Sequence, residues 1–91
     1  MEKKLIGKLI TTDNKVSVIT PKNNKNFTFK ELYEILDCDM IELRDSIKEE
    51  NLILVCNEDV PEDEPINFIA TMIAGYGLRG NVVCCHSSLV T

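Results

Sequence analysis

Short runs of alternating apolar and polar residues lie near the start of the chain. The run "LIGKLI" (residues 5–10) and the run "VSVIT" (residues 16–20) are separated by the polar stretch "TTDNK". In the second run Val16 and Val18 share one face. Such alternation is typical of strands, and a polar segment between two strands is typical of a turn. The pattern predicts a β-hairpin that ends at Pro21.

The clearest helix pattern begins at Thr28. Glu31 follows three residues later, which is the spacing of a capping box, where the threonine hydroxyl accepts a backbone N–H and the carboxylate reaches back. Phe27 and Leu32 have the spacing of a hydrophobic staple. Apolar residues then recur with helical period, so we predict a helix over residues 29–36 with one apolar face.

Two further runs predict a second hairpin over residues 41–56. The segment "DMIELRD" alternates, with Ile41 and Leu43 on one face and Glu42 and Arg44 on the other. The segment "LILVCN" is continuously apolar and rich in branched residues. A run of that kind indicates a strand that is buried on both faces. We therefore expect the second strand of this hairpin to lie inside the sheet.

A loop, a second helix and a last strand complete the pattern. Five of the seven residues from 58 to 64 are acidic, and two prolines in "NEDVPEDEP" break regular structure. Pro65 suits the start of a helix. Large apolar residues then recur at helical spacing, namely Phe68, Ile69, Met72 and Ile73. The run "NVVCCH" predicts a final strand whose successive residues point to opposite faces.

This order of elements predicts a single domain over residues 1–91. A chain of 91 residues has the size of one small domain. The fold class is α+β, in the order ββαββαβ, with two helices packed on a mostly antiparallel sheet.

The stretch "GYGLRG" matches the spacing G-x-G-x-x-G of a dinucleotide site through Gly75, Gly77 and Gly80. That site requires a strand before the glycines and a helix after them, so that the helix N-terminus meets the phosphates. Here a helix precedes the glycines, and the carbonyl end of a helix repels phosphate. We expect Gly75 to end the helix in a left-handed conformation, and Gly77 and Gly80 to turn the chain into the last strand.

Composition and hydropathy indicate an ordinary globular protein. Hydrophobic residues make up 44% of the chain and charged residues 27%. No apolar run approaches the roughly 18 residues of a membrane span. The N-terminal segment lacks the continuous apolar core of a signal peptide. We therefore expect a cytoplasmic location and no membrane partner.

The formal net charge of −5 conceals an uneven distribution. Residues 1–30 contain seven lysines and two acidic residues, whereas residues 31–91 contain three basic and thirteen acidic residues. Such polarity can steer a charged partner or favour self-association into a homo-oligomer. Nucleic acid is not an expected partner, because acidic residues dominate and Phe27 and Phe29 are needed for the first helix.

The cysteines and the histidine are the other candidates for chemistry. Cys84, Cys85 and His86 are adjacent, but neighbours on a strand point to opposite faces, and no C-x-x-C pair accompanies them. We expect the four cysteines, which include Cys38 and Cys56, to be reduced thiols that pack in the core. No metal or other cofactor is expected. A metal- or thiol-dependent enzyme that uses Cys84, Cys85 and His86 is one alternative function.

The order of segments resembles a family of small domains of unknown function found in phages and bacterial mobile elements. The resemblance rests on the runs "FTFKELYEILDCDMIEL", "LILVCNED", "INFIATMIAG" and "GNVVCC". The matching positions are Asn57-Glu58, Asn67 with Ala70-Thr71, and Gly80-Asn81-Val82. A longer acidic loop and the adjacent cysteines depart from the family pattern. The resemblance implies an accessory protein that acts on a host component, and it implies no catalytic residue.

We expect from these observations a non-enzymatic binding module whose partner is a host protein. The predicted binding residues are the polar ones at the matching positions and their neighbours, namely Asn57, Glu58, Asn67, Thr71, Arg79 and Asn81. The same residue types also serve as caps and turns, so a purely structural role is the competing interpretation. A second function hypothesis is a protein that sequesters a nucleotide or another small anionic ligand through Arg79 and backbone N–H groups.

Overall fold

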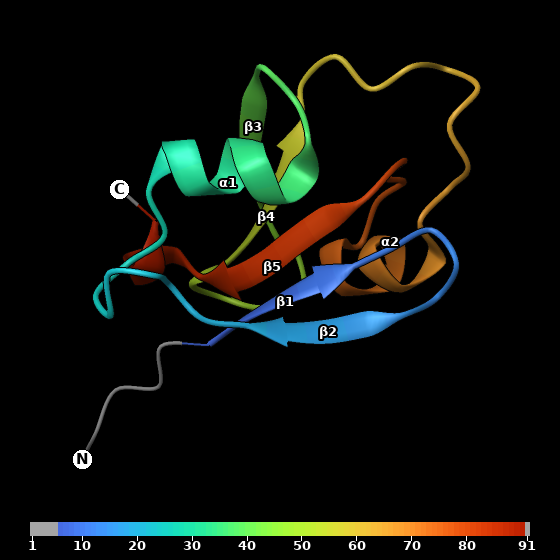
Figure 1. Ribbon diagram of the computed structural model, residues 1–91. Helices are drawn as coiled ribbons and strands as arrows, with labels where there is room; N and C mark the ends of the chain where they lie inside the picture. Colours follow the sequence, from blue (N-terminus) through green and yellow to red (C-terminus); the bar gives the residue numbers. More distant parts are fainter. Residues whose placement is uncertain (1–5, 91) are drawn as a thin grey trace.

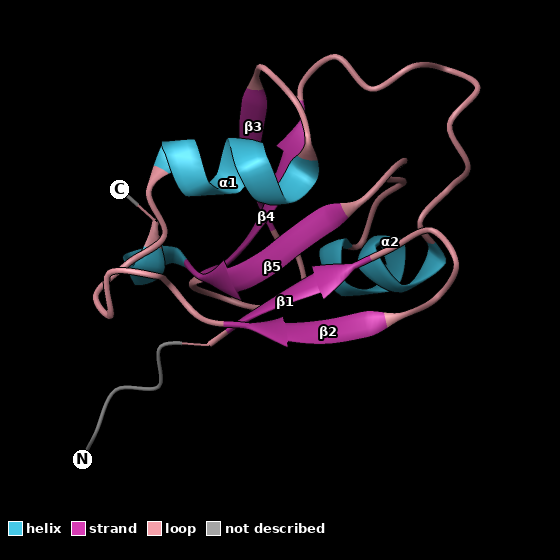
Figure 2. Ribbon diagram, viewed as in Figure 1, coloured by secondary structure: helices cyan, strands magenta, loops and turns pink. Residues whose placement is uncertain are grey.

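The fold is one antiparallel sheet with a helix on each face, as the computed structural model of the protein shows for residues 6–90 (Figures 1 and 2). The elements follow in the predicted order ββαββαβ. Their bounds are β1 Gly7–Ile10, β2 Val16–Ile19, α1 Phe29–Leu36, β3 Ile41–Asp45, β4 Leu52–Asn57, α2 Phe68–Ala74 and β5 Val82–His86. The α+β class and the helix over residues 29–36 are therefore confirmed.

The five strands lie in the order β2-β1-β5-β4-β3, and every neighbouring pair is antiparallel. The last strand, β5, lies between the hairpin β1–β2 and the hairpin β3–β4 (Figure 1). The prediction that β4 is an interior strand is confirmed, and β5 occupies the middle of the sheet. The edges of the sheet are β2 and β3.

One core cluster lies between α1 and the sheet. Phe27 and Leu32, the two residues of the predicted staple, are fully buried in it beside Val83 and Cys85 of β5. The Thr28 hydroxyl accepts the Glu31 N–H at 3.2 Å, which confirms the cap.

The reciprocal half of the predicted capping box takes a different form. The Glu31 carboxylate accepts the backbone N–H of Lys22, with 3.2 Å between the nitrogen and Oε2. The loop before α1 comes close enough to use this acceptor, so Glu31 stabilises the loop as well as the first turn of the helix.

The second core cluster lies between α2 and the opposite face of the sheet. The helix contacts this cluster through Ala70 and Ala74, which are fully buried, whereas Phe68 is 62% exposed and Met72 is 69% exposed. The helix is confirmed, but the large side chains do not all form its buried face. Alanines allow a short helix to approach the sheet closely. Ile69 and Ile73 also pack against this cluster, and only Phe68 and Met72 lie on the outer side of the helix.

Helix α2 begins at Phe68 and not at Pro65, because Asn67 is its N-cap. At its other end Gly75 has a φ of 90°, the left-handed conformation expected after a helix. Gly80 also has a positive φ, of 75°. Gly77 does not, so of the three glycines only Gly75 and Gly80 adopt the left-handed conformation that favours glycine.

Candidate functional site

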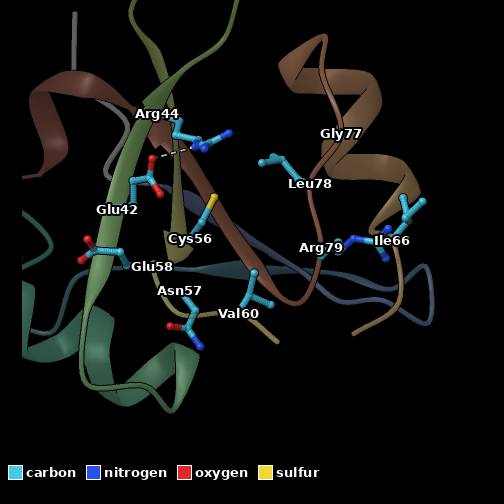
Figure 3. Close-up of a pocket in the computed structure, with 10 residues that line it drawn as sticks. All are labelled: Glu42, Arg44, Cys56, Asn57, Glu58, Val60, Ile66, Gly77, Leu78 and Arg79. Atoms are coloured by element: carbon cyan, nitrogen blue, oxygen red, sulfur yellow. Dashed lines mark hydrogen bonds and ion pairs between the residues drawn. The ribbon is translucent and has the colours of Figure 1, made fainter. Parts of the chain in front are cut away.

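An open groove of about 290 Å³ lies between the edge strand β3 and the segment that follows α2 (Figure 3). Its lining residues come from β3, β4, the segment between β4 and α2, and residues 77–79. They are Glu42, Arg44, Cys56, Asn57, Glu58, Val60, Ile66, Gly77, Leu78 and Arg79. The groove exists because α2 covers the centre of the sheet and leaves this part of β3 and β4 uncovered.

An ion pair on β3 forms one wall of the groove. Arg44 Nε donates to Glu42 Oε1 at 2.9 Å, and both side chains are about two-fifths exposed. This hydrogen bond raises the pKa of the Arg44 guanidinium above its usual value, so that the group stays charged. The guanidinium carbon lies 5.5 Å from the centre of the Tyr76 ring, within the range of a cation–π contact. Tyr76 in turn donates its hydroxyl to the Asp45 carbonyl at 2.8 Å, which holds the wall against the end of α2.

The opposite wall is formed by residues 77–79 and is largely apolar. The buried Leu78 side chain points toward the Arg44 and Glu42 side chains, and Val60 closes one end (Figure 3). Arg79 Nη1 donates to the Glu64 carbonyl at 2.9 Å. In Figure 3 the Arg79 side chain ends beside Ile66, so the two arginines do not point at one another.

The structure brings three of the six predicted binding residues to this groove. Asn57, Glu58 and Arg79 all line it. Asn81 lies outside the groove and lines a neighbouring hollow of about 310 Å³, to which Asn57 also contributes. The Asn81 side chain accepts the Thr12 N–H at 3.3 Å, and it is exposed.

Asn67 and Thr71 have structural contacts instead. Asn67 is fully buried, caps α2 through its Oδ1, and donates from Nδ2 to the carbonyls of Ile10 and Gly80 at 2.9 Å each. The Thr71 hydroxyl accepts the Leu78 N–H at 2.9 Å. Both residues therefore fix the position of the segment after α2, and this segment forms one wall of the groove.

Sequence reasoning did not select Arg44 and Glu42, which make the most distinct polar feature of the groove. A signal for them exists in the alternation of "DMIELRD", which places these opposite charges two residues apart on one face of a strand. Strand neighbours on one face are close enough to pair. The pattern did not show that this strand lies at an edge of the sheet, where such a pair borders a groove.

All four cysteines are free thiols, of which Cys56, Cys84 and Cys85 are buried in the core and Cys38 is partly exposed. Cys84 belongs to the cluster under α2 and Cys85 to the cluster under α1, which confirms that they point to opposite faces. Burial raises the pKa of the Cys56 and Cys85 thiols to about 11, and it also raises the pKa of Cys84. Within residues 6–90 there is no group of three or more histidine, cysteine or acidic side chains that could hold a metal ion.

We expect the thiols to differ in reactivity toward iodoacetamide. Cys38 is partly exposed, whereas Cys56, Cys84 and Cys85 are less than 10% exposed. A pKa of about 11 leaves Cys56 and Cys85 with on the order of one thiolate in a thousand at about pH 8, and burial also raises the pKa of Cys84, so the buried thiols should react slowly. Peptide mass spectrometry should find Cys38 alkylated first and the other three only in urea. Rapid modification of Cys84 in the folded protein would instead favour the thiol-enzyme hypothesis.

Comparisons of the chain with protein-family models, curated proteins and solved structures found no match. No helix within residues 6–90 has the length and hydropathy needed to cross a membrane. The family resemblance stated above stays a prediction.

Proposed function

We propose that this chain is a non-enzymatic binding module that holds a segment of a partner protein in the groove beside β3. The observation that supports the proposal most is that Asn57, Glu58 and Arg79 line a single groove with apolar residues and a partly exposed ion pair. Protein interfaces combine an apolar centre with a polar rim, and arginine is enriched in them. The resemblance to phage and mobile-element domains supports a host component in the cytoplasm as the partner.

The charges of the groove favour a protein segment over a nucleotide. Arg44 and Arg79 are balanced by Glu42 and Glu58, and the adjoining loop carries further acidic residues. A nucleotide has several negative charges and gains no net attraction from such a site. The two arginines also fail to converge on one point, as a phosphate clamp would require (Figure 3). A peptide segment with apolar side chains and charges of both signs fits these walls better.

The test begins with affinity capture from a bacterial lysate and continues with calorimetry on the purified captured protein. We expect Arg44→Gln and Ile66→Gln each to weaken binding by at least about tenfold, because each removes a contact from one wall of the groove. The matched control is Lys30→Gln, which removes one exposed positive charge from α1 on the other face of the sheet. It should leave Kd within about twofold, since surface charges outside an interface contribute little.

Two results would count against this function. One is that no captured protein depends on the groove, so that the variants and the control bind alike. The other is that a panel of nucleotides and cyclic nucleotides raises the melting temperature of the wild type but not of Arg44→Gln, which would assign the groove to a small anion.

A further inference from the structure

Strand β2 is an edge strand without charged residues, and its branched side chains are exposed. Within Val16–Ile19 no residue is charged, and Val16 is 47% exposed and Val18 66% exposed. In Figure 1 none of the described elements lies beyond β2. Uncovered edges of this kind can pair with another strand, and proteins commonly protect them with charges or covering segments.

The hydrogen-bond pattern shows which backbone groups face outward. Thr11 donates its N–H to the Lys15 carbonyl at 3.0 Å, so these two residues form a hydrogen-bonded pair of the antiparallel ladder. Hydrogen-bonded and non-hydrogen-bonded pairs alternate along such a ladder. Since Val16 pairs with Ile10 and Val18 with Lys8, the N–H and C=O groups of Val16 and Val18 point away from β1.

The other edge strand, β3, is protected in both ways. It contains Glu42, Arg44 and Asp45 within five residues. Its far end is covered by the end of α2, because Tyr76 donates to the Asp45 carbonyl and the Ile47 N–H donates to the Ala74 carbonyl at 2.9 Å. The two edges therefore differ in the features that prevent strand pairing, and only β2 is open to it within residues 6–90.

We propose that the β2 edge is a self-association surface, on which a second copy of this chain adds its own β2 in antiparallel orientation across a twofold axis at Ser17. In this register Val16 of each copy lies opposite Val18 of the other. Each such pair forms two backbone hydrogen bonds. The four outward N–H groups of the two copies therefore donate to the four outward C=O groups. The four valine side chains lie on the same face and bury one another.

The charges around β2 suit this arrangement. Lys15 of one copy lies opposite the uncharged Ile19 of the other, so no like charges face each other across the strands. Asp13 precedes β2 and pairs with Lys15 of its own chain, and Lys22 follows β2 and pairs with Glu34. The twofold axis brings the Asp13 end of one copy toward the Lys22 end of the other, so opposite charges approach each other there. The groove lies beside β3, at the opposite edge of the sheet, and stays open in such a dimer.

The proposal is tested by sedimentation velocity on the full chain over a concentration series. A pair of four-residue strands buries less than the roughly 1,200 Å² of a standard interface, so we expect a weak, reversible dimer. The average mass should rise from that of one chain toward twice that mass between about 10 µM and about 1 mM. Val18→Lys places a charge on the edge and should weaken association at least about tenfold.

The matched control is Leu43→Lys, the same change at a 45% exposed position of the other edge strand, which should leave association unchanged. Circular dichroism checks that both variants fold, and Val16→Lys replaces Val18→Lys if the latter does not. Amide hydrogen exchange on the wild type gives a second readout, in which the Val16 and Val18 N–H groups exchange more slowly at high concentration. A wild type that stays at the mass of one chain throughout, or a dimer that a folded valine variant leaves as strong as in the wild type, would overturn the proposal, as would a dimer that Leu43→Lys weakens equally.

Discussion

Asn67→Ala is expected to lower the free energy of unfolding by about 3–5 kcal/mol, because three hydrogen bonds of a buried side chain are removed at once. The Asn67 amide donates to the carbonyls of Ile10 and Gly80, and its oxygen caps α2. The Gly80 carbonyl left without this donor costs about 1–3 kcal/mol, the Ile10 carbonyl keeps its pairing with Val82 but loses a second hydrogen bond worth about 1 kcal/mol, and a lost N-cap costs about 1 kcal/mol. A loss of this size approaches the whole stability of many small domains.

Urea unfolding followed by far-UV circular dichroism measures this loss. Asn81→Ala is the matched control, since Asn81 is exposed and accepts a single backbone N–H, so its loss should stay below about 1 kcal/mol. Asn67→Asp separates the two roles, because it keeps an oxygen for the cap and removes the amide donors. If Asn67→Asp were as stable as the wild type, the bonds to the two carbonyls would contribute nothing, and the structural interpretation of Asn67 would be wrong.

Gly75→Ala is expected to cost about 2–3 kcal/mol of unfolding free energy. A left-handed conformation costs an L-residue about 1–2 kcal/mol, and Gly75 has a φ of 90°. A Cβ at this position would also lie 2.4 Å from Cγ1 of Ile47, so the exposed Ile47 side chain has to move. Forcing this side chain off its rotamer adds about 0.5–1.5 kcal/mol.

Gly77→Ala in the same segment is the control for this substitution. Gly77 has no positive φ, and a Cβ there would meet no atom within 4 Å, so the change should be neutral or slightly stabilising. Melting temperature and urea midpoint of the two variants give the comparison. Equal stability of both variants would show that the end of α2 tolerates a side chain, contrary to its geometry here.

Local signals in the sequence were sufficient for most of the elements. Thr28 and Glu31 identified α1 to the residue, because a cap depends only on neighbours along the chain. The pattern of α2 was harder to interpret, since apolar residues lie on nearly all sides of a seven-residue helix. Its buried face was decided by how closely alanines allow it to approach the sheet, which is a tertiary property and leaves Phe68 and Met72 outside.

The candidate site was predictable only in part, for the same reason. Asn57 and Arg79 are far apart in sequence, and both were selected from local patterns. Those patterns gave no sign that the two residues line the same groove. Asn67 came from the same selection and proved to be a core residue, because an asparagine before a helix is as suitable for a cap as for a ligand. Strand order separates these outcomes, and strand order depends on contacts that no local pattern contains.

The central place of β5 has a consequence for how the protein is made. The hairpins β1–β2 and β3–β4 do not pair with each other. Each is joined to the rest of the sheet only by its pairing with β5, Val82–His86. During synthesis both hairpins emerge before their common partner, and isolated hairpins are at best marginally stable in water. The growing chain therefore has to wait for residues 82–86 before a complete sheet can form. Until then the apolar faces of β1 and β4 are exposed to other unfinished chains and to chaperones.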